Sequence, residues 1–233
     1  PAAGPRLRRQ PGQALTARRV VNARTAGHNG RMNATDILQH PSQVIPTVDY
    51  RRERWRNGLG WTREILRLPS DGEDWAVRLS IAEIESDAAF SSFPGVDREL
   101  VLLHGNGVRL RFDDGRLEEV LPPHGRVRFA GEQSLHGELV DGTTHDFNLM
   151  WRRDTLAAQV LHRPIVGPMY FFTEPDVAWA IHLLAGQPGF DADAGLPPME
   201  QGDTAWLAAG ERRRHALHGG GELLAIRLGP AVP

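Results

Sequence analysis

The chain has 233 residues, enough for one large domain or two small ones with a full hydrophobic core. It contains no cysteine, which excludes disulfides, thiolate nucleophiles and cysteine-bound metals and fits a reducing, cytoplasmic location. The sequence has no apolar run as long as a membrane-spanning helix, so we expect no membrane partner.

The formal net charge of −2 conceals an uneven distribution. Residues 1–31 carry seven arginines and no acidic residue; without these seven, the 27 basic residues fall to 20, against 29 acidic ones. Residues 32–233 are therefore clearly acidic. Nucleic-acid binding requires a basic face, so we expect no nucleic-acid partner.

The head, residues 1–31, has no apolar periodicity and is rich in Pro, Gly, Ala and Arg. This composition predicts a segment that is disordered or not native to the protein. A transit peptide and a phosphate-binding arm are two alternatives. We favour a third, in which Met32 is the native start, because the chain uses arginine throughout and contains no lysine, as GC-rich coding sequences often do.

The stretch WRNGLGWTREI at residues 55–65 places Trp55, Asn57 and two glycines before an expected strand. Glycine allows positive φ and close backbone approach. Thr62 and Glu64 lie two residues apart, so a strand would point both to one face. The stretch indicates a polar turn leading into a pocket-lining strand, or else a plain hairpin with a solvated face.

Alternation with a period of two dominates the rest of the chain. In residues 74–84 every second side chain is apolar, with Arg78 and Ser80 on the other face, and in residues 144–151 Asp146 and Asn148 lie opposite an apolar face. Further strands are expected at 98–103, 107–112, 126–130, 135–140, 156–162, 169–173, 177–184, 204–208 and 222–228. Short helices are expected at 36–40 and within 85–95. This pattern predicts an all-β sandwich or barrel.

Residues 102–131 and 183–212 share a weak internal repeat. Each begins Leu-Leu-x-Gly, passes a Pro-Pro pair and ends a short strand at Ala-Gly. This succession of short strands, glycine turns and proline-bounded segments is typical of a cupin barrel. Its repetition suggests two stacked barrels, a first over 32–151 with the pocket and a second over 152–233. Chance similarity between glycine-rich β sequences is the alternative.

Recognisable catalytic motifs are scarce. A metal-dependent cupin would place two histidines at i and i+2 on one strand face, and none of the 10 histidines has this spacing. The nearest pair, His215 and His218, lies in an expected turn. The sequence also lacks a Gly-x-Ser-x-Gly elbow and a phosphate-binding loop with lysine. We therefore expect no metal, no cofactor and no catalytic residues.

Polar pairs on the expected strand faces suggest a binding pocket instead. An arginine such as Arg78 offers a planar fork that can bind a carboxylate through two hydrogen bonds. Asn and Ser side chains add neutral donors and acceptors. The combination suits a small carboxylate-bearing molecule, although solvated faces with surface ion pairs would give the same pattern.

Four ordered motifs, WRNGLGWTREI, WAVRLSIAEI, FSSFPGVDREL and DFNLMWRR, resemble the HutD/Ves family of bacterial bicupins. The resemblance implies an all-β, two-barrel cupin protein without the usual metal ligands. It also implies a non-catalytic protein that binds a carboxylated histidine-catabolism intermediate, of the formylglutamate, formiminoglutamate or urocanate type. Such a protein would modulate histidine utilisation or a stress response.

Matching motif to motif places ligand-binding residues at twelve positions: Trp55, Asn57, Thr62, Glu64, Arg78, Ser80, Phe90, Ser91, Phe93, Arg98, Asp146 and Asn148. The two arginines would bind carboxylate, the two phenylalanines would wall the site, and the two acids would orient the arginines. One departure is Leu59, which replaces the middle of the family's three consecutive glycines and cannot adopt positive φ cheaply.

Two other classes of function stay open from the sequence. One is a cupin isomerase or hydrolase using a metal near His215 and His218, and the other is a module that binds a protein partner. The sequence does not distinguish a monomer from a homodimer paired through open sheet edges.

Overall fold

The computed structural model describes residues 33–70 and 74–231, all within one compact unit, Met32–Pro233. The arginine-rich head and the expectations attached to it lie outside the described residues. The first element is helix α1 (Ala34–Leu38), where a short helix is expected. Asn33 caps it by accepting a hydrogen bond from the Asp36 amide at 2.9 Å, which satisfies an otherwise unpaired N–H group. Among the described residues, no helix has the length and apolarity needed to cross a membrane.

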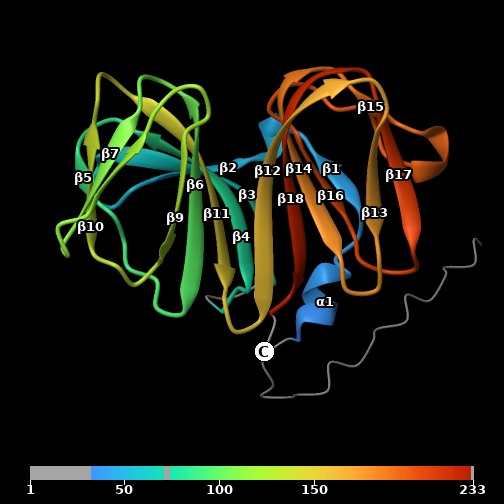
Figure 1. The fold of residues 1–233 in the computed structure, drawn as a ribbon, viewed down its shortest axis with the longest axis horizontal. Helices are drawn as coiled ribbons and strands as arrows, with labels where there is room; N and C mark the ends of the chain where they lie inside the picture. Colours follow the sequence, from blue (N-terminus) through green and yellow to red (C-terminus); the bar gives the residue numbers. More distant parts are fainter. Residues whose placement is uncertain (1–32, 71–73, 232–233) are drawn as a thin grey trace, which may run out of the picture. The chain divides into compact units, whose positions relative to one another are not determined.

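The N-terminal half is built from two antiparallel sheets (Figure 1). The six-stranded sheet has the order β2 (Arg51–Arg54), β3 (Gly60–Leu68), β4 (Val77–Ile84), β11 (Thr144–Arg152), β6 (Val96–His104) and β9 (Arg126–Ala130). The four-stranded sheet has the order β5 (Ala88–Ala89), β10 (Leu135–Leu139), β7 (Val108–Phe112) and β8 (Leu117–Val120). Apolar side chains from β6, β7 and β9, including Leu100, Leu110 and Phe129, fill the space between them.

The C-terminal half repeats this plan. Its five-stranded sheet has the order β1 (Gln43–Ile45), β16 (Thr204–Leu207), β14 (Ala178–Gly186), β18 (Gly220–Pro230) and β12 (Leu156–Val166). Its three-stranded sheet has the order β13 (Met169–Thr173), β17 (Arg213–His218) and β15 (Gly189–Phe190), and short 3-10 turns occupy Thr47–Asp49 and Ala192–Ala194. The order β12-β18-β14-β16 matches β4-β11-β6-β9, so the weak sequence repeat corresponds to equivalent strands, and the predicted all-β, two-barrel fold is confirmed.

The two large sheets pack against each other through the largest apolar cluster of the described residues. Leu79, Phe147 and Trp151 from the first sheet meet Trp206 and Ile226 from the second, and each is at most 1% exposed. Because side chains alternate along a strand, the opposite faces of β4 and β11 point into the first barrel. The apolar positions of these strands therefore join the barrels, and the polar positions are left to line a cavity.

Two local expectations are wrong. No helix forms within 85–95, where β5 is followed by an extended segment whose amides bond elsewhere: Phe90 N–H to Leu135 O at 3.0 Å and Phe93 N–H to Gly131 O at 2.8 Å. The expected turn around His215 and His218 is strand β17. In contrast, all nine further strands expected from the alternation are present.

The division of the chain at residue 151 stays a prediction. The structure adds that β1, which precedes that point, pairs with the edge of the five-stranded sheet, with Val44 opposite Ala205. Strand β1 therefore completes a sheet of the C-terminal half.

Candidate ligand-binding site

A cavity of about 430 Å³ lies against the polar face of the six-stranded sheet in the first barrel. Its lining contains ten of the twelve side chains predicted from the sequence: Trp55, Asn57, Thr62, Arg78, Ser80, Phe90, Ser91, Phe93, Arg98 and Asn148. A pocket of this volume is typical of sites for small molecules. That these residues contact a ligand stays a prediction.

The strand register explains why residues distant in sequence meet here. On β11, Asn148 pairs with Ser80 of β4, and Met150 pairs with both Arg78 of β4 and Arg98 of β6. Paired residues in neighbouring strands point to the same face. The register therefore brings two guanidinium groups to one end of the cavity, on either side of a methionine.

The polar turn before β3 forms one wall of the cavity. The Trp55 indole N–H donates to the Thr62 hydroxyl at 2.9 Å, and the Asn57 carboxamide oxygen accepts from the Leu59 amide at 3.0 Å. Gly58 alone takes positive φ, at +74°, so Leu59 needs no left-handed backbone. A Cβ atom at Gly60 would lie 2.4 Å from a carbonyl oxygen of β4. The loop therefore tolerates leucine in place of the middle glycine.

Arg98 is the most unusual group in the site. It is 5% exposed, and its guanidinium lies 5.0–5.6 Å from the ring centres of Phe90, Phe93 and Phe129. Its Nη1 donates to the Ser91 carbonyl at 3.3 Å, and its Nε has no partner. Among the described residues, no carboxylate forms an ion pair with it. Burial, together with the nearby charge of Arg78, lowers the pKa of Arg98 to about 10.

Arg78 is held by an acid, as expected. Its Nε donates to Glu64 Oε2 at 2.7 Å, and Glu64 also faces Arg67 at 3.5 Å. Glu64 does not line the cavity, and it contacts the site through its ion pair with Arg78. The buried amide oxygen of Asn148 has no hydrogen-bond partner. The cavity thus contains the Arg98 guanidinium, which has no carboxylate partner among the described residues, and the Asn148 amide oxygen, which has no hydrogen-bond partner. Both are suited to binding a polar ligand.

The expectation that Asp146 orients an arginine is wrong. Asp146 is fully buried, accepts a hydrogen bond from the Thr144 hydroxyl at 2.7 Å, and leaves its Oδ1 without a partner. Burial raises the pKa of Asp146 to about 7. Its register partners are Ala82 and Leu102, which places it deeper in the apolar interior than Asn148 on the same face.

Several lining residues were missed. Ala82, Leu100 and Met150 share strand faces with predicted residues, so extending the alternation by two positions would have found them. Glu53 and Arg54 come from β2, whose four residues are all exposed and show no alternation.

A metal held by His215 and His218 is contradicted by the structure. On strand β17 their odd spacing points them to opposite faces, one buried and one exposed. His215 faces the Thr173 hydroxyl at 3.3 Å, and His218 bonds Asp191 at 2.6 Å. A different group, His124, His162 and Glu222, does bring potential metal ligands together.

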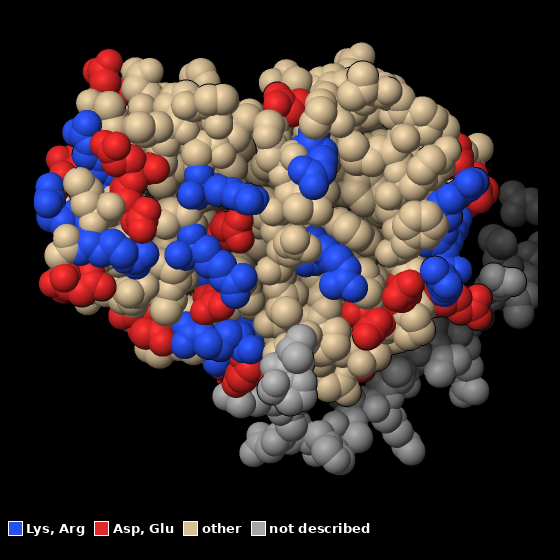
Figure 2. Space-filling view, in the orientation of Figure 1, with Lys and Arg blue, Asp and Glu red and all other residues tan. Residues whose placement is uncertain are grey.

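Figure 2 shows arginine and acidic side chains interspersed over one face of the molecule. Many arginines of the described residues are paired, such as Arg128 with Asp97 at 2.7 Å and Arg153 with Glu132 at 2.6 Å. Exposed pairs of this kind contribute little to stability. The Arg98 guanidinium inside the first barrel differs from these surface arginines because no carboxylate of the described residues is paired with it.

Two antiparallel barrels with the same strand order, and a polar cavity inside the first, define a two-barrel cupin protein. The chain belongs to the HutD family, whose model matches residues 47–225. It is 37% identical over 171 residues to protein Ves of Cronobacter sakazakii, covering 73% of this chain and 89% of that protein. The structure of HutD from Pseudomonas fluorescens superimposes with a TM-score of 0.71 at 27% identity, covering 82% of this chain and 99% of that one.

A third relative is an uncharacterized 21.2 kDa protein from the hutC 3′ region of Pseudomonas putida. It is 40% identical over 110 residues, which cover 47% of this chain and 57% of that protein. This chain thus matches little more than half of the Pseudomonas putida protein and nearly all of the Cronobacter sakazakii one.

Proposed function

We propose that the protein binds a small carboxylated metabolite in the first-barrel cavity without transforming it. The observation that supports this most strongly is Arg98, a buried guanidinium with a partner-free Nε and no carboxylate paired with it among the described residues. A buried charge is costly unless it is paired. A ligand carboxylate would supply the missing partner, with Arg78 as a second donor already oriented by Glu64.

The rest of the lining fits a ligand with a second polar group. Ser80 and Asn148 are neighbours on adjacent strands and offer a hydroxyl and a carboxamide. The Phe90 and Phe93 rings lie beside the Arg98 guanidinium. A ligand with a carboxylate at one end and a formyl, formimino or imidazole group at the other would pair with both the arginines and the Ser80–Asn148 pair. Formylglutamate, formiminoglutamate and urocanate have this chemistry, and we propose one of them as the ligand.

The proposed role is to hold this intermediate and so restrain flux through histidine utilisation, or its induction. The relative from the hutC 3′ region of Pseudomonas putida supports this branch, and similarity to protein Ves leaves a stress-response role as the alternative. The HutD structure from Pseudomonas fluorescens was determined in a formate condition, and formate is the smallest carboxylate that could test such a cavity.

Isothermal titration calorimetry with N-formyl-L-glutamate, N-formimino-L-glutamate, urocanate and formate tests the proposal. Wild-type protein should bind at least one with 1:1 stoichiometry, and Arg78→Ala should abolish binding while unfolding stays cooperative. Arg111→Ala is the matched control, because Arg111 is a 57% exposed arginine paired with Glu138 on the four-stranded sheet. Equal affinity in Arg78→Ala and wild type would remove Arg78 from the binding site, and absence of binding of all four carboxylates to wild type would overturn the proposed function.

A further inference from the structure

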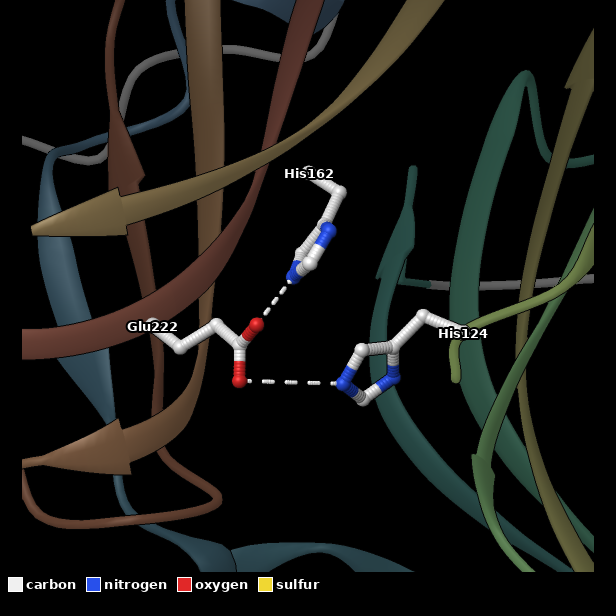
Figure 3. A group of neighbouring side chains, drawn as sticks. All are labelled: His124, His162 and Glu222. Atoms are coloured by element: carbon white, nitrogen blue, oxygen red, sulfur yellow. Dashed lines mark hydrogen bonds and ion pairs between the residues drawn. The ribbon is translucent and has the colours of Figure 1, made fainter. Parts of the chain in front are cut away.

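Three metal-ligand side chains from distant parts of the chain converge between the two barrels. His124 lies in the turn between β8 and β9, His162 on β12 and Glu222 on β18 (Figure 3). One ligand atom from each lies within 4.8 Å of the other two. None of the three lines the first-barrel cavity, so this cluster is a separate site.

A hydrogen bond at one ring nitrogen of His124 determines which nitrogen is available to bind a metal ion. Nδ1 lies 2.9 Å from the Leu102 carbonyl oxygen, which can only accept, so Nδ1 carries the proton. In the neutral ring Nε2 then holds a lone pair, and it faces Glu222 Oε2 at 3.8 Å. These two acceptor atoms form no hydrogen bond with each other, so a cation between them would gain contacts with both. A histidine that donates one N–H to a backbone carbonyl is also the usual arrangement of a metal ligand.

The other two side chains complete the set. His162 Nε2 lies 2.6 Å from Glu222 Oε1, and the rings of His162 and His124 are 4.8 Å apart between centres. His124 has φ of +50°, the positive value unusual for a residue other than glycine. Backbone conformations of this kind persist where the surroundings hold them and cluster at functional sites.

We propose that His124, His162 and Glu222 bind a divalent transition-metal ion of the Zn²⁺ type, linking the two barrels. Two imidazoles and one carboxylate are a common set of three protein ligands for zinc, leaving a fourth position open. Ligand atoms around a tetrahedral zinc ion lie about 3.4 Å apart, as its bond lengths of about 2.1 Å require. The present distances of 2.6 and 3.8 Å between Glu222 and the two histidines lie on either side of that value.

The position of the site determines whether an ion can reach it and how a bound ion would affect stability. The side chains are 17%, 38% and 38% exposed for His124, His162 and Glu222, so an ion can enter from solvent. His124 and Glu222 also border a cavity of about 310 Å³ that could admit a fourth ligand. Because the three ligands are brought together only in the folded protein, the ion would stabilise the fold by RT ln(1 + c/Kd), where c is the concentration of free Zn²⁺.

Calorimetric titration of ZnCl₂ into protein purified without a histidine tag tests the site. Wild type should bind one ion, and His124→Gln and His162→Gln should each weaken binding at least about tenfold, the loss typical even of residues that only support metal ligands. His136→Gln is the control, because His136 is an exposed histidine on β10 outside the cluster. Absence of zinc binding, or unchanged affinity in both cluster variants, would identify the cluster as an ordinary ion pair.

A second measurement does not depend on the variants folding. Crystals of wild-type protein soaked in ZnCl₂ should show an anomalous peak at about 2.1 Å from both imidazoles and the carboxylate. A peak elsewhere, or none, overturns the proposal. Neither result affects the first-barrel cavity, whose test uses organic carboxylates and the Arg78→Ala variant.

Discussion

Replacing Arg98 with methionine should stabilise the ligand-free protein and abolish carboxylate binding. Burial, together with the nearby charge of Arg78, lowers the pKa of Arg98 to about 10, which means that the fold disfavours the charged form by about 3 kcal/mol at neutral pH. The substitution also loses the hydrogen bond to the Ser91 carbonyl, worth about 1 kcal/mol. Methionine keeps much of the volume, and its sulfur can pack against the rings that surround Arg98. The net expected gain is about 2 kcal/mol.

Thermal and urea unfolding of the ligand-free proteins measure this gain. For a domain of this size about 2 kcal/mol corresponds to a rise in Tm of about 4–8 °C. Arg111→Met, at the exposed ion pair with Glu138, should change stability by less than about 0.5 kcal/mol. If Arg98→Met instead lowers the free energy of unfolding, Arg98 stabilises the ligand-free fold. It is then not an uncompensated charge that needs a ligand carboxylate.

Three further predictions follow from individual contacts. Asp146 should keep its proton in the fold up to about pH 7 and lose it near 3.8 when unfolded, so its contribution to stability falls as pH rises between these values. Relative to Asp146→Asn, wild type should therefore lose about 3 kcal/mol from pH 5 to pH 8 in urea unfolding, and a constant difference would refute the burial argument. Gly60→Ala should cost about 1–3 kcal/mol, because its Cβ would lie 2.4 Å from a backbone carbonyl. Gly210→Ala, with open space around it, should change stability little, and equal effects of the two would contradict the steric reasoning. Glu64→Gln should weaken ligand binding several-fold by releasing Arg78, and calorimetry showing unchanged affinity would remove its orienting role.

The strand alternation predicted much of the site because one physical pattern determines both fold and lining. In β4 and β11 the apolar positions are needed to join the two large sheets, so the polar positions had to face elsewhere. Residues such as Ser80 and Asn148 could be placed on one face from their spacing alone. The family motifs added Phe90 and Ser91, which lie in an extended segment without a periodic signal.

Two features could not be predicted from the sequence: how deeply a side chain is buried, and which segments distant in the sequence lie together. Asp146 and Asn148 share a face, but the strand register places Asp146 two positions further into the apolar interior. The segment RRER of β2 carries no alternation because all four side chains are exposed. His124, His162 and Glu222 come from three separate segments, and only the packing of the two barrels brings them together.

A crystal structure of the protein with the tightest-binding carboxylate will show whether a carboxylate group lies beside Arg98 inside the first barrel. We expect carboxylate oxygens about 2.8 Å from the guanidinium nitrogens of Arg98 and Arg78, the distance typical of charged hydrogen bonds. A ligand bound at saturating concentration anywhere outside this cavity would contradict it.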